Sequence, residues 1–371
     1  MIRGNARVWD VARTDMMIGL AELGTSVIDR AASDGLEPRG PAGNGTLVGR
    51  LARSALRLTL RPAAARAERL LLNRAAPLRV PPIYLLGVPR SGTTLLYQLL
   101  AHCFRVAYFC NAAEAHSRYA ALMTYWMRAR IRVHETDFTS EYGRARGPEA
   151  PSEGLDIWRR FFPEGYVDDR YLDARAADTL RRIISAVSGI LAAPFVNKDP
   201  NHCPRVRALD ALFPGTLYVY VYRDPVATAA SLLTIRRNRV ARGEIELGTW
   251  TSVRPREYDR FRDLDVVGQI SGQVHCAALN ALNDLRAVAA DRWIGIRYET
   301  LCADPRGTMS RIAAFLAERG APLERRHPAP SSFSAALGGA VSPADRETIQ
   351  REFVRRFGPA ALESPEDIDA T

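Results

Sequence analysis

The strongest structural signal in the sequence is Pro82-Ile83-Tyr84-Leu85-Leu86-Gly87-Val88-Pro89-Arg90-Ser91-Gly92-Thr93-Thr94. Its first part, Ile83–Leu86, is a short apolar run between a proline and a glycine, which predicts a buried strand. Residues 93–102 then show a helical pattern. A strand, a glycine-rich loop and a helix in this order direct backbone N–H groups and the positive end of a helix dipole at one point. The stretch therefore predicts a binding site for a phosphate-like oxyanion.

One position separates this loop from that of nucleotide hydrolases. Gly87 and Gly92 have the spacing of the nucleotide-binding P-loop, but Thr93 stands where that motif has its lysine, followed by the usual hydroxyl at Thr94. In hydrolases the lysine reaches the β- and γ-phosphates, and the hydroxyl contributes to magnesium binding. Here the positive charge lies inside the loop at Arg90, whose planar fork of donors suits a terminal oxyanion. We therefore expect the loop to bind a 5′-phosphate that carries a further oxyanion, and we expect no metal site.

A second motif follows the apolar run Leu217–Tyr222, which predicts a strand. The strand ends at Arg223, and a helix is expected to begin at Pro225 and to carry Ser231 on its second turn. Open α/β sheets bind ligands at the carboxyl ends of their strands, where Arg223 would lie. An arginine and a hydroxyl form a compact phosphate site. The alternative is an ion pair of Arg223 with Asp224 that caps the helix, and the presence of the first motif favours the phosphate site.

Short apolar runs alternate with helical patterns over the rest of the chain. Besides those above, strands are expected at residues 105–109, 195–197 and 293–298, and helices at residues 178–191, 204–212, 225–237, 266–290 and 306–318. This alternation predicts an α/β fold with a P-loop-like parallel β-sheet flanked by helices on both faces. We assign that domain to residues 79–371.

Residues 1–78 are expected to form an N-terminal helical extension. Apolar residues recur at helical spacing over 9–23 and 47–72, with a Pro/Gly-rich stretch between them. An arginine-rich face is formed by Arg50, Arg53, Arg57 and Arg61. Two interpretations are open, peripheral contact with a membrane and a solvated face of a packed helix, and we favour the second.

Composition narrows the classes of partner and compartment. The formal net charge is +10 and the pI about 9.7, which favours anionic ligands. The basic residues are spread along the chain without a polybasic block, so a nucleic-acid partner is not expected. The five cysteines include no CxxC pair and the N-terminus lacks a signal-peptide pattern, so a cytoplasmic location with reduced thiols is expected. No pattern specifies an oligomeric state.

The two motifs together resemble those of the PAPS-dependent sulfotransferases, which use 3′-phosphoadenosine 5′-phosphosulfate (PAPS) as sulfuryl donor. The resemblance spans residues 82–316 and implies that Arg90, Ser91, Gly92, Thr93 and Thr94 bind the 5′-phosphosulfate, with no metal. It further implies that Arg223 and Ser231 bind the 3′-phosphate. Residues 296–301, followed by Asp304-Pro305, resemble a family stretch that we interpret as mainly structural. Asn197-Lys198-Asp199-Pro200 is similar to a segment of the tyrosylprotein-sulfotransferase branch.

The resemblance also suggests the catalytic residues. Lys198 is the only lysine in the chain, and we expect it to stabilise the leaving oxygen as a compact cationic donor, with Arg90 assisting in the loop. The general base is open between two glutamates. Glu114 follows the second expected strand, where the tyrosylprotein branch has its glutamate, although the surrounding residues differ, and Glu153 lies in an irregular segment. His116 and His202 are weaker candidates.

The acceptor is expected to be a small molecule, a glycan or a peptide. Aromatic and arginine-rich residues at 125–132 and 158–166 are expected to belong either to its pocket or to the core. Two other functions are kept as alternatives. A P-loop small-molecule kinase is disfavoured by Thr93, and a non-catalytic nucleotide-binding or scaffold protein is mildly disfavoured by Lys198.

Overall fold

The computed structural model describes residues 47–141, 143–246, 248–335 and 341–363. The chain divides into two units, residues 1–74 and 75–371. The first unit contains α2 (Leu47–Arg74), which covers the predicted helix at 47–72. The helix expected at 9–23 lies outside the described residues. Within the described ranges no helix is both long and apolar enough to cross a bilayer. The division at residue 78 and the membrane contact stay predictions.

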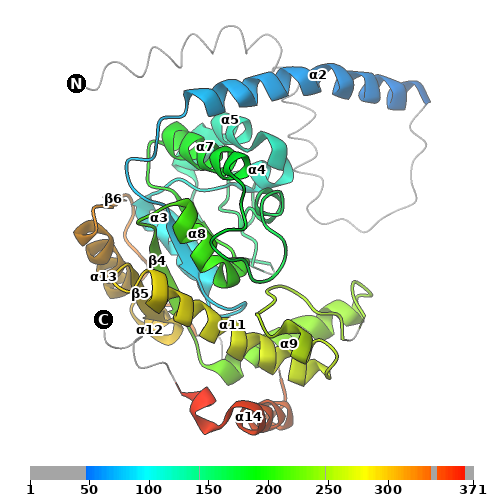
Figure 1. Ribbon diagram of the computed structural model, residues 1–371, viewed down its shortest axis with the longest axis vertical. Helices are drawn as coiled ribbons and strands as arrows, with labels where there is room; N and C mark the ends of the chain where they lie inside the picture. Colours follow the sequence, from blue (N-terminus) through cyan, green and yellow to red (C-terminus); the bar gives the residue numbers. More distant parts are fainter. Residues whose placement is uncertain (1–46, 142, 247, 336–340, 364–371) are drawn as a thin grey trace. The chain divides into compact units, whose positions relative to one another are not determined.

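The second unit is built on a four-stranded sheet (Figure 1). Its strands are β1 (Ile83–Leu86), β3 (Val196–Lys198), β4 (Leu217–Tyr222) and β5 (Trp293–Arg297), in the order β3-β1-β4-β5. Every pair of neighbours is parallel. The first three strands are buried along their whole length, as expected for a sheet covered on both faces. The predicted parallel sheet is confirmed.

Helices form a layer on each face of this sheet. On one face, α3 (Thr93–Cys103) contacts α13 (Pro305–Glu318), and on the other α8 (Val206–Leu212) contacts α11 (Val266–Val288). This division follows from the strand order, because right-handed connections from β1 to β3 and from β3 to β4 run in opposite directions along the sheet. The helices that flank the sheet are therefore those that the sequence predicted.

One predicted strand is corrected. Residues 105–109 do not form a strand of the main sheet. Instead β2 (Phe104–Arg105) pairs antiparallel with β6 (Glu324–Arg325), and only Ala107 forms a parallel bridge, to Phe195. The reason is that the backbone after residue 107 forms its hydrogen bonds with a segment outside the sheet. The carbonyl of Phe109 accepts a hydrogen bond from the Ser152 amide at 2.7 Å, so the chain leaves the sheet edge.

The other elements connect or cover this framework. Figure 1 places α9 beside α11 and next to α14, and their contacts agree. The elements are α4 (Asn111–Ala115), η1 (Ser117–Tyr119), α5 (Ala120–Val133), α6 (Leu155–Trp158), α7 (Ala174–Leu191), η2 (Pro200–Arg205), α9 (Pro225–Ala241), α10 (Tyr258–Phe261), α12 (Tyr298–Ala303), α14 (Pro343–Phe357) and η3 (Pro359–Leu362).

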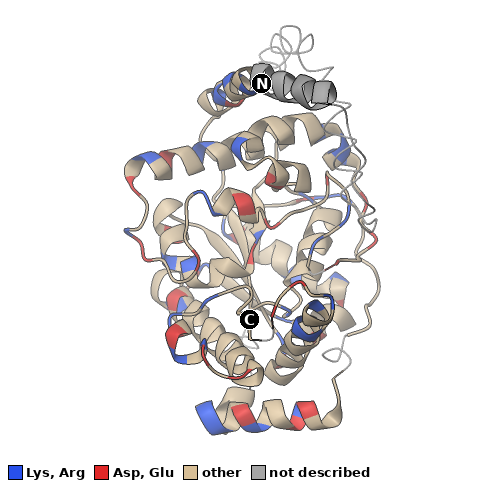
Figure 2. Cartoon of the chain, turned by 90° about the vertical axis from the view of Figure 1, so that its right-hand side faces the viewer, with Lys and Arg blue, Asp and Glu red and all other residues tan. Residues whose placement is uncertain are grey.

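The strand register fixes where the site lies. Leu85 of β1 pairs with Lys198 of β3, and Leu86 pairs with Tyr220 of β4. The loops after β1, β3 and β4 therefore open at one edge of the sheet, where connections of opposite direction leave neighbouring strands. Figure 2 shows basic and acidic residues interspersed along the elements of this unit, in line with the spread of charge in the sequence.

Candidate active site

The loop after β1 has the backbone conformation of an anion cradle. Arg90 and Gly92 have φ angles of 73° and 100°, which turn the loop back on itself. The Ser91 amide donates to the Val88 carbonyl at 3.1 Å, and the Ser91 hydroxyl is buried without a hydrogen-bond partner in the described structure. Gly87 lies so close to this hydroxyl that an added Cβ would be 2.5 Å from it. The Ser91 side chain is thus enclosed within the loop, and its predicted contact with the donor stays a prediction.

Gly92 is required at its position by two independent features. Its φ of 100° is disfavoured for residues with a side chain, and an added Cβ would lie 2.2 Å from the Tyr298 ring. We expect Gly92→Ala to lower the free energy of unfolding by about 1–3 kcal/mol and to weaken nucleotide binding, as measured by denaturant titration and calorimetry. The control is Gly189→Ala in α7, where an added Cβ meets nothing within 4 Å. Equal stability of Gly92→Ala and the parent chain would contradict this role.

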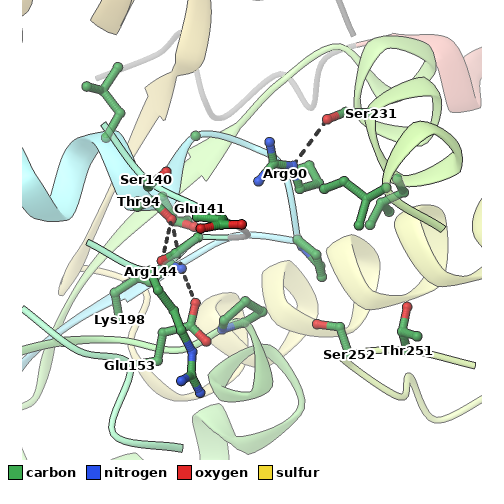
Figure 3. Close-up of a pocket in the computed structure, with 18 of the residues that line it drawn as sticks. Arg90, Thr94, Ser140, Glu141, Arg144, Glu153, Lys198, Ser231, Thr251 and Ser252 are labelled. Carbon is green, nitrogen blue, oxygen red and sulfur yellow. Dashed lines mark hydrogen bonds and ion pairs between the residues drawn. The ribbon is translucent and has the colours of Figure 1, made fainter. Parts of the chain in front are cut away.

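Two arginines meet beside the loop. Arg90 donates from Nε to the Ser231 hydroxyl at 3.1 Å (Figure 3). Arg223 donates from Nη1 to the Arg90 carbonyl at 2.8 Å. The guanidinium of Arg223 also lies 4.7 Å from the centre of the Tyr298 ring. Arg223 and Ser231 are buried and come from the end of β4 and from α9. The structure thus brings together the residues that both sequence motifs had singled out.

The electrostatics of this cluster favour an anion. Burial lowers the pKa of Arg90, and the neighbouring charge of Arg223 lowers it further. Burial also lowers the pKa of Arg223, although Tyr298, Glu299 and Asp224 partly offset the effect. Two partly desolvated cations side by side repel each other, and anions bound to them would relieve that repulsion. Asp224 caps α9 by accepting from the Ala227 amide at 2.6 Å.

Lys198 lies at the end of β3, at the other side of the phosphate loop. Its ammonium donates to the Thr94 hydroxyl at 3.0 Å and forms an ion pair with the Glu153 carboxylate. The Lys198 side chain is only 3% exposed and that of Glu153 22%. Burial raises the pKa of Glu153, and the positive charge of Lys198 partly offsets the increase. The arrangement joins a cation, a carboxylate and a loop hydroxyl at one point.

Buried neighbours fix this group in place. The Asn197 side chain accepts from Trp158 Nε1 at 3.0 Å and donates to the carbonyls of Ser152 and Glu153, both at 3.3 Å. Asp199 caps η2 by accepting from the Asn201 amide at 2.9 Å. The residues on either side of Lys198 therefore have structural partners, whereas Lys198 itself lines the cavity described below, as does Pro200.

Glu114 plays a different part from that of Glu153. It is buried, accepts from the Gly154 amide at 3.2 Å and from the Ser152 hydroxyl, and pairs with Arg144 at 3.0 Å. It is not among the side chains that line the cavity described below. Glu114 thus holds the turn that carries Glu153, and the geometry favours Glu153 over Glu114 as the base.

The remaining candidates lie away from this group. His202 is fully buried, and its Nε2 lies 2.8 Å from the Asn197 side-chain oxygen. His116 lies with Nδ1 3.2 Å from the Ala112 carbonyl. Trp158 belongs to the core, while its neighbour Arg159 reaches the cavity. In the described part of the chain, no three His, Cys, Asp or Glu side chains gather in a way that could hold a metal ion.

A cavity of about 800 Å³ connects these groups. It is lined by the loop residues Pro89, Arg90, Gly92, Thr93 and Thr94 and by Lys198, Glu153, Arg223 and Ser231. The sequence had not identified several other lining residues, and it had taken Tyr298 as part of a structural stretch. Apart from Tyr298, which begins α12, those residues belong to irregular segments or to α9, where no motif marks them. They are Ser140, Glu141, Arg144, Arg146, Arg239, Glu244, Thr251, Ser252 and Tyr298.

Comparisons with known proteins identify chains that are similar to this one. The chain is 22% identical over 257 residues to omega-hydroxy-beta-dihydromenaquinone-9 sulfotransferase Stf3 from Mycobacterium tuberculosis, and equally to that from Mycobacterium bovis. The match covers 62% of this chain and spans 61% of the length of those relatives. Among solved structures, sulfotransferase STF9 from Mycobacterium avium has a TM-score of 0.47 at 16% identity, covering 93% of this chain and 96% of that one. The sulfotransferase domain from the curacin biosynthetic pathway has a TM-score of 0.38 at 17% identity, covering 78% and 100%.

The family assignment comes from the match to a family model. Residues 81–319 match the model of the sulfotransferase family. This range contains β1, β3, β4 and β5 together with the phosphate loop, Lys198, Arg223 and Ser231. The chain belongs to the sulfotransferase family.

Proposed function

We propose that this protein transfers a sulfuryl group from PAPS to a hydroxyl or amine of an acceptor. The observation that carries the proposal is the shared cavity. It joins the oxyanion loop, the pair of Arg223 and Ser231, and the buried Lys198. A donor with a phosphosulfate at one end and a phosphate at the other requires two separate anion sites and a cation at the bond that breaks. These residues fit such a donor.

The residues of the loop position the donor. Arg90 and the backbone N–H groups at the start of α3 would hold the 5′-phosphosulfate, with the hydroxyls of Thr93 and Thr94 as further donors. Arg223 and Ser231 would hold the 3′-phosphate. When bound, PAPS supplies the activated sulfuryl group. The protein contributes mainly position and charge, as in phosphoryl transfer.

Lys198 is suited to stabilise the oxygen that leaves sulfur. An ammonium has three N–H donors, and among the described residues two of them serve Glu153 and Thr94. The third remains for the bridging oxygen, on which negative charge develops. Burial of Lys198 strengthens this interaction, because the surroundings screen charge less than water does.

Glu153 is suited to accept the proton of the acceptor. Its carboxylate lines the cavity beside Lys198, so an acceptor oxygen that approaches sulfur comes within its reach. As the acceptor attacks, its proton passes to Glu153 and the oxygen–sulfur bond to the donor breaks. Glu114 and Arg144 would support this carboxylate by fixing the turn at Ser152 and Gly154.

The dependence of turnover on pH tests this assignment. A base must be deprotonated, and burial raises the pKa of Glu153, so the acid limb of kcat should lie above the pH range of an ordinary glutamate. We expect Glu153→Gln to lower kcat by about 10²- to 10⁴-fold and to remove this limb. Glu114→Gln serves as the matched control and should keep the limb while losing stability. A limb that disappears in Glu114→Gln but persists in Glu153→Gln would reverse the two roles.

The activity itself is tested by incubating the full chain with ³⁵S-labelled PAPS and a panel of hydroxyl and amine acceptors. Acceptor-dependent transfer of label, with release of adenosine 3′,5′-bisphosphate, is the expected result. A parallel incubation with γ-³²P-labelled ATP and magnesium tests the kinase alternative. Transfer from ATP in the absence of transfer from PAPS would contradict the proposal.

A further inference from the structure

The wall of the cavity opposite Lys198 consists of an irregular segment between α9 and α10. Thr251 and Ser252 line the cavity from this segment, and Figure 3 shows both across the pocket from Lys198 and Glu153. Ser252 has a φ of 69°, unusual for a residue with a side chain. Four non-glycine residues in the described chain have a positive φ, and of these only Ser252 and Arg90 line the cavity. We call residues 248–253 the clamped wall.

Two glutamines one turn apart on α11 hold this wall. The Gln273 amide donates to the carbonyls of Thr251 and Val253 at 2.7 and 2.8 Å. Gln269 donates to the Gly248 carbonyl at 3.0 Å. Both glutamines are buried, and Trp250 closes the segment by donating to the Val253 carbonyl at 3.0 Å. The wall is therefore fixed through its backbone, which leaves its hydroxyls available to the cavity.

A buried arginine orients both glutamines. Arg236 of α9 donates from Nη1 to the side-chain oxygen of Gln269 at 2.7 Å and from Nη2 to that of Gln273 at 3.3 Å. It is only 2% exposed and lies 5.7 Å from the Trp250 ring centre. None of its partners in the described chain is a carboxylate, and burial lowers the pKa of Arg236 to about 10. A buried arginine without a counter-ion is costly, so the order that it imposes on the wall is its evident contribution.

Both sides of the cavity carry polar groups, and Leu155, Leu232 and Ile235 line it as well. Thr251 and Ser252 offer hydroxyls, and beside them Arg239 and Glu244 form an ion pair at 3.1 Å that can both donate and accept. The side next to the phosphate loop carries Ser140 and further charged residues. An apolar chain in this space would remove these groups from water without replacing their hydrogen bonds, whereas a polyhydroxylated molecule would replace them.

We propose that the acceptor is a hydroxyl-rich, carbohydrate-like molecule that lies against the clamped wall, and that Arg236 is the positioning residue of that wall. The inference rests on the proposed sulfuryl transfer and specifies its acceptor class. Thr251 and Ser252 would bind hydroxyls of the acceptor that do not react, so that one further hydroxyl meets Glu153. That hydroxyl loses its proton to Glu153 as its oxygen bonds to sulfur, and adenosine 3′,5′-bisphosphate leaves.

The test offers the full chain ³⁵S-labelled PAPS with three sets of probes. The first contains glucose, N-acetylglucosamine, maltose and galacturonate, the second the apolar alcohol farnesol, and the third a tyrosine peptide. We expect label in the first set. Thr251→Val/Ser252→Ala should raise the acceptor KM by about tenfold while leaving the affinity for adenosine 3′,5′-bisphosphate within about twofold. Thr348→Val/Ser310→Ala removes exposed hydroxyls outside this cavity and should change neither value.

Arg236→Met separates positioning from direct contact. Amide hydrogen exchange at residues 248–253 should speed up by at least about tenfold. The acceptor KM should rise about as much as it does in Thr251→Val/Ser252→Ala. Label only in farnesol or the peptide, no label in any carbohydrate, or an unchanged KM in the double variant would overturn the inference. If calorimetry shows no binding of adenosine 3′,5′-bisphosphate, the proposed function itself fails, so the two failures are distinguishable.

Discussion

Lys198→Met is expected to lower turnover by about 10²- to 10³-fold while keeping the affinity for adenosine 3′,5′-bisphosphate within about threefold. The reason is that Lys198 would act on charge that develops only as the oxygen leaves sulfur. An interaction confined to the transition state contributes to kcat and little to binding of the product nucleotide. The measurement is single-turnover transfer of label from ³⁵S-PAPS, with calorimetry on the same preparation.

The matched variant is Lys198→Arg, which keeps the charge. Its planar fork is larger than an ammonium, and the site is nearly closed to solvent, so we expect most of the loss to persist. Because Lys198→Met leaves Glu153 without its cation, and the larger guanidinium of Lys198→Arg must fit a nearly closed site, thermal unfolding should accompany both measurements. Turnover within about tenfold of the parent chain in a folded Lys198→Met would show that this lysine does not stabilise the leaving oxygen.

Arg223→Ala and Arg90→Ala are each expected to weaken binding of adenosine 3′,5′-bisphosphate by about 100-fold, or about 2.7 kcal/mol. Both cations lie in one cavity, and a hydrogen bond from a guanidinium to a phosphate is among the stronger ones. The two variants should differ in what they bind. Arg223→Ala should lose the contribution of the 3′-phosphate, and Arg90→Ala that of the 5′-phosphate.

The control for these variants is Arg311→Ala on the exposed side of α13, which changes the net charge equally but lies outside the cavity. It should leave the affinity unchanged. A loss as large in Arg311→Ala as in Arg223→Ala would indicate a general charge effect, and neither arginine would then belong to a phosphate site.

The sequence predicted the framework of the fold because its signals are local. A run such as Ile83–Leu86 between a proline and a glycine needs no distant partner to be interpreted, and the same is true of Leu217–Tyr222 before Arg223 and Pro225. Since the carboxyl ends of parallel strands share one edge, the meeting of Arg90, Arg223 and Lys198 followed from the predicted topology. The error at residues 105–109 arose where the partner of the backbone, near Ser152, lies far along the chain.

The cavity beyond these motifs could not be predicted for the same reason. Whether Glu114 or Glu153 faces the site depends on Arg144 and on the turn at Ser152, which no spacing reveals. The clamped wall depends on contacts between α9, α11 and the segment between them. Tyr298 was placed in a structural stretch because residues 296–301 resemble a family segment interpreted in that way, yet its ring lies against Arg223 and Gly92.

Calorimetry of the unmodified chain with three nucleotides most directly tests whether one cavity holds both phosphorylated ends of one adenosine. We predict micromolar affinity for adenosine 3′,5′-bisphosphate, or about −8 kcal/mol, and binding at least about 100-fold weaker for adenosine 5′-monophosphate and for adenosine 3′-monophosphate. Equal affinity for the bisphosphate and the 5′-monophosphate would contradict the account, since Arg223 and Ser231 would then contribute no second anion site.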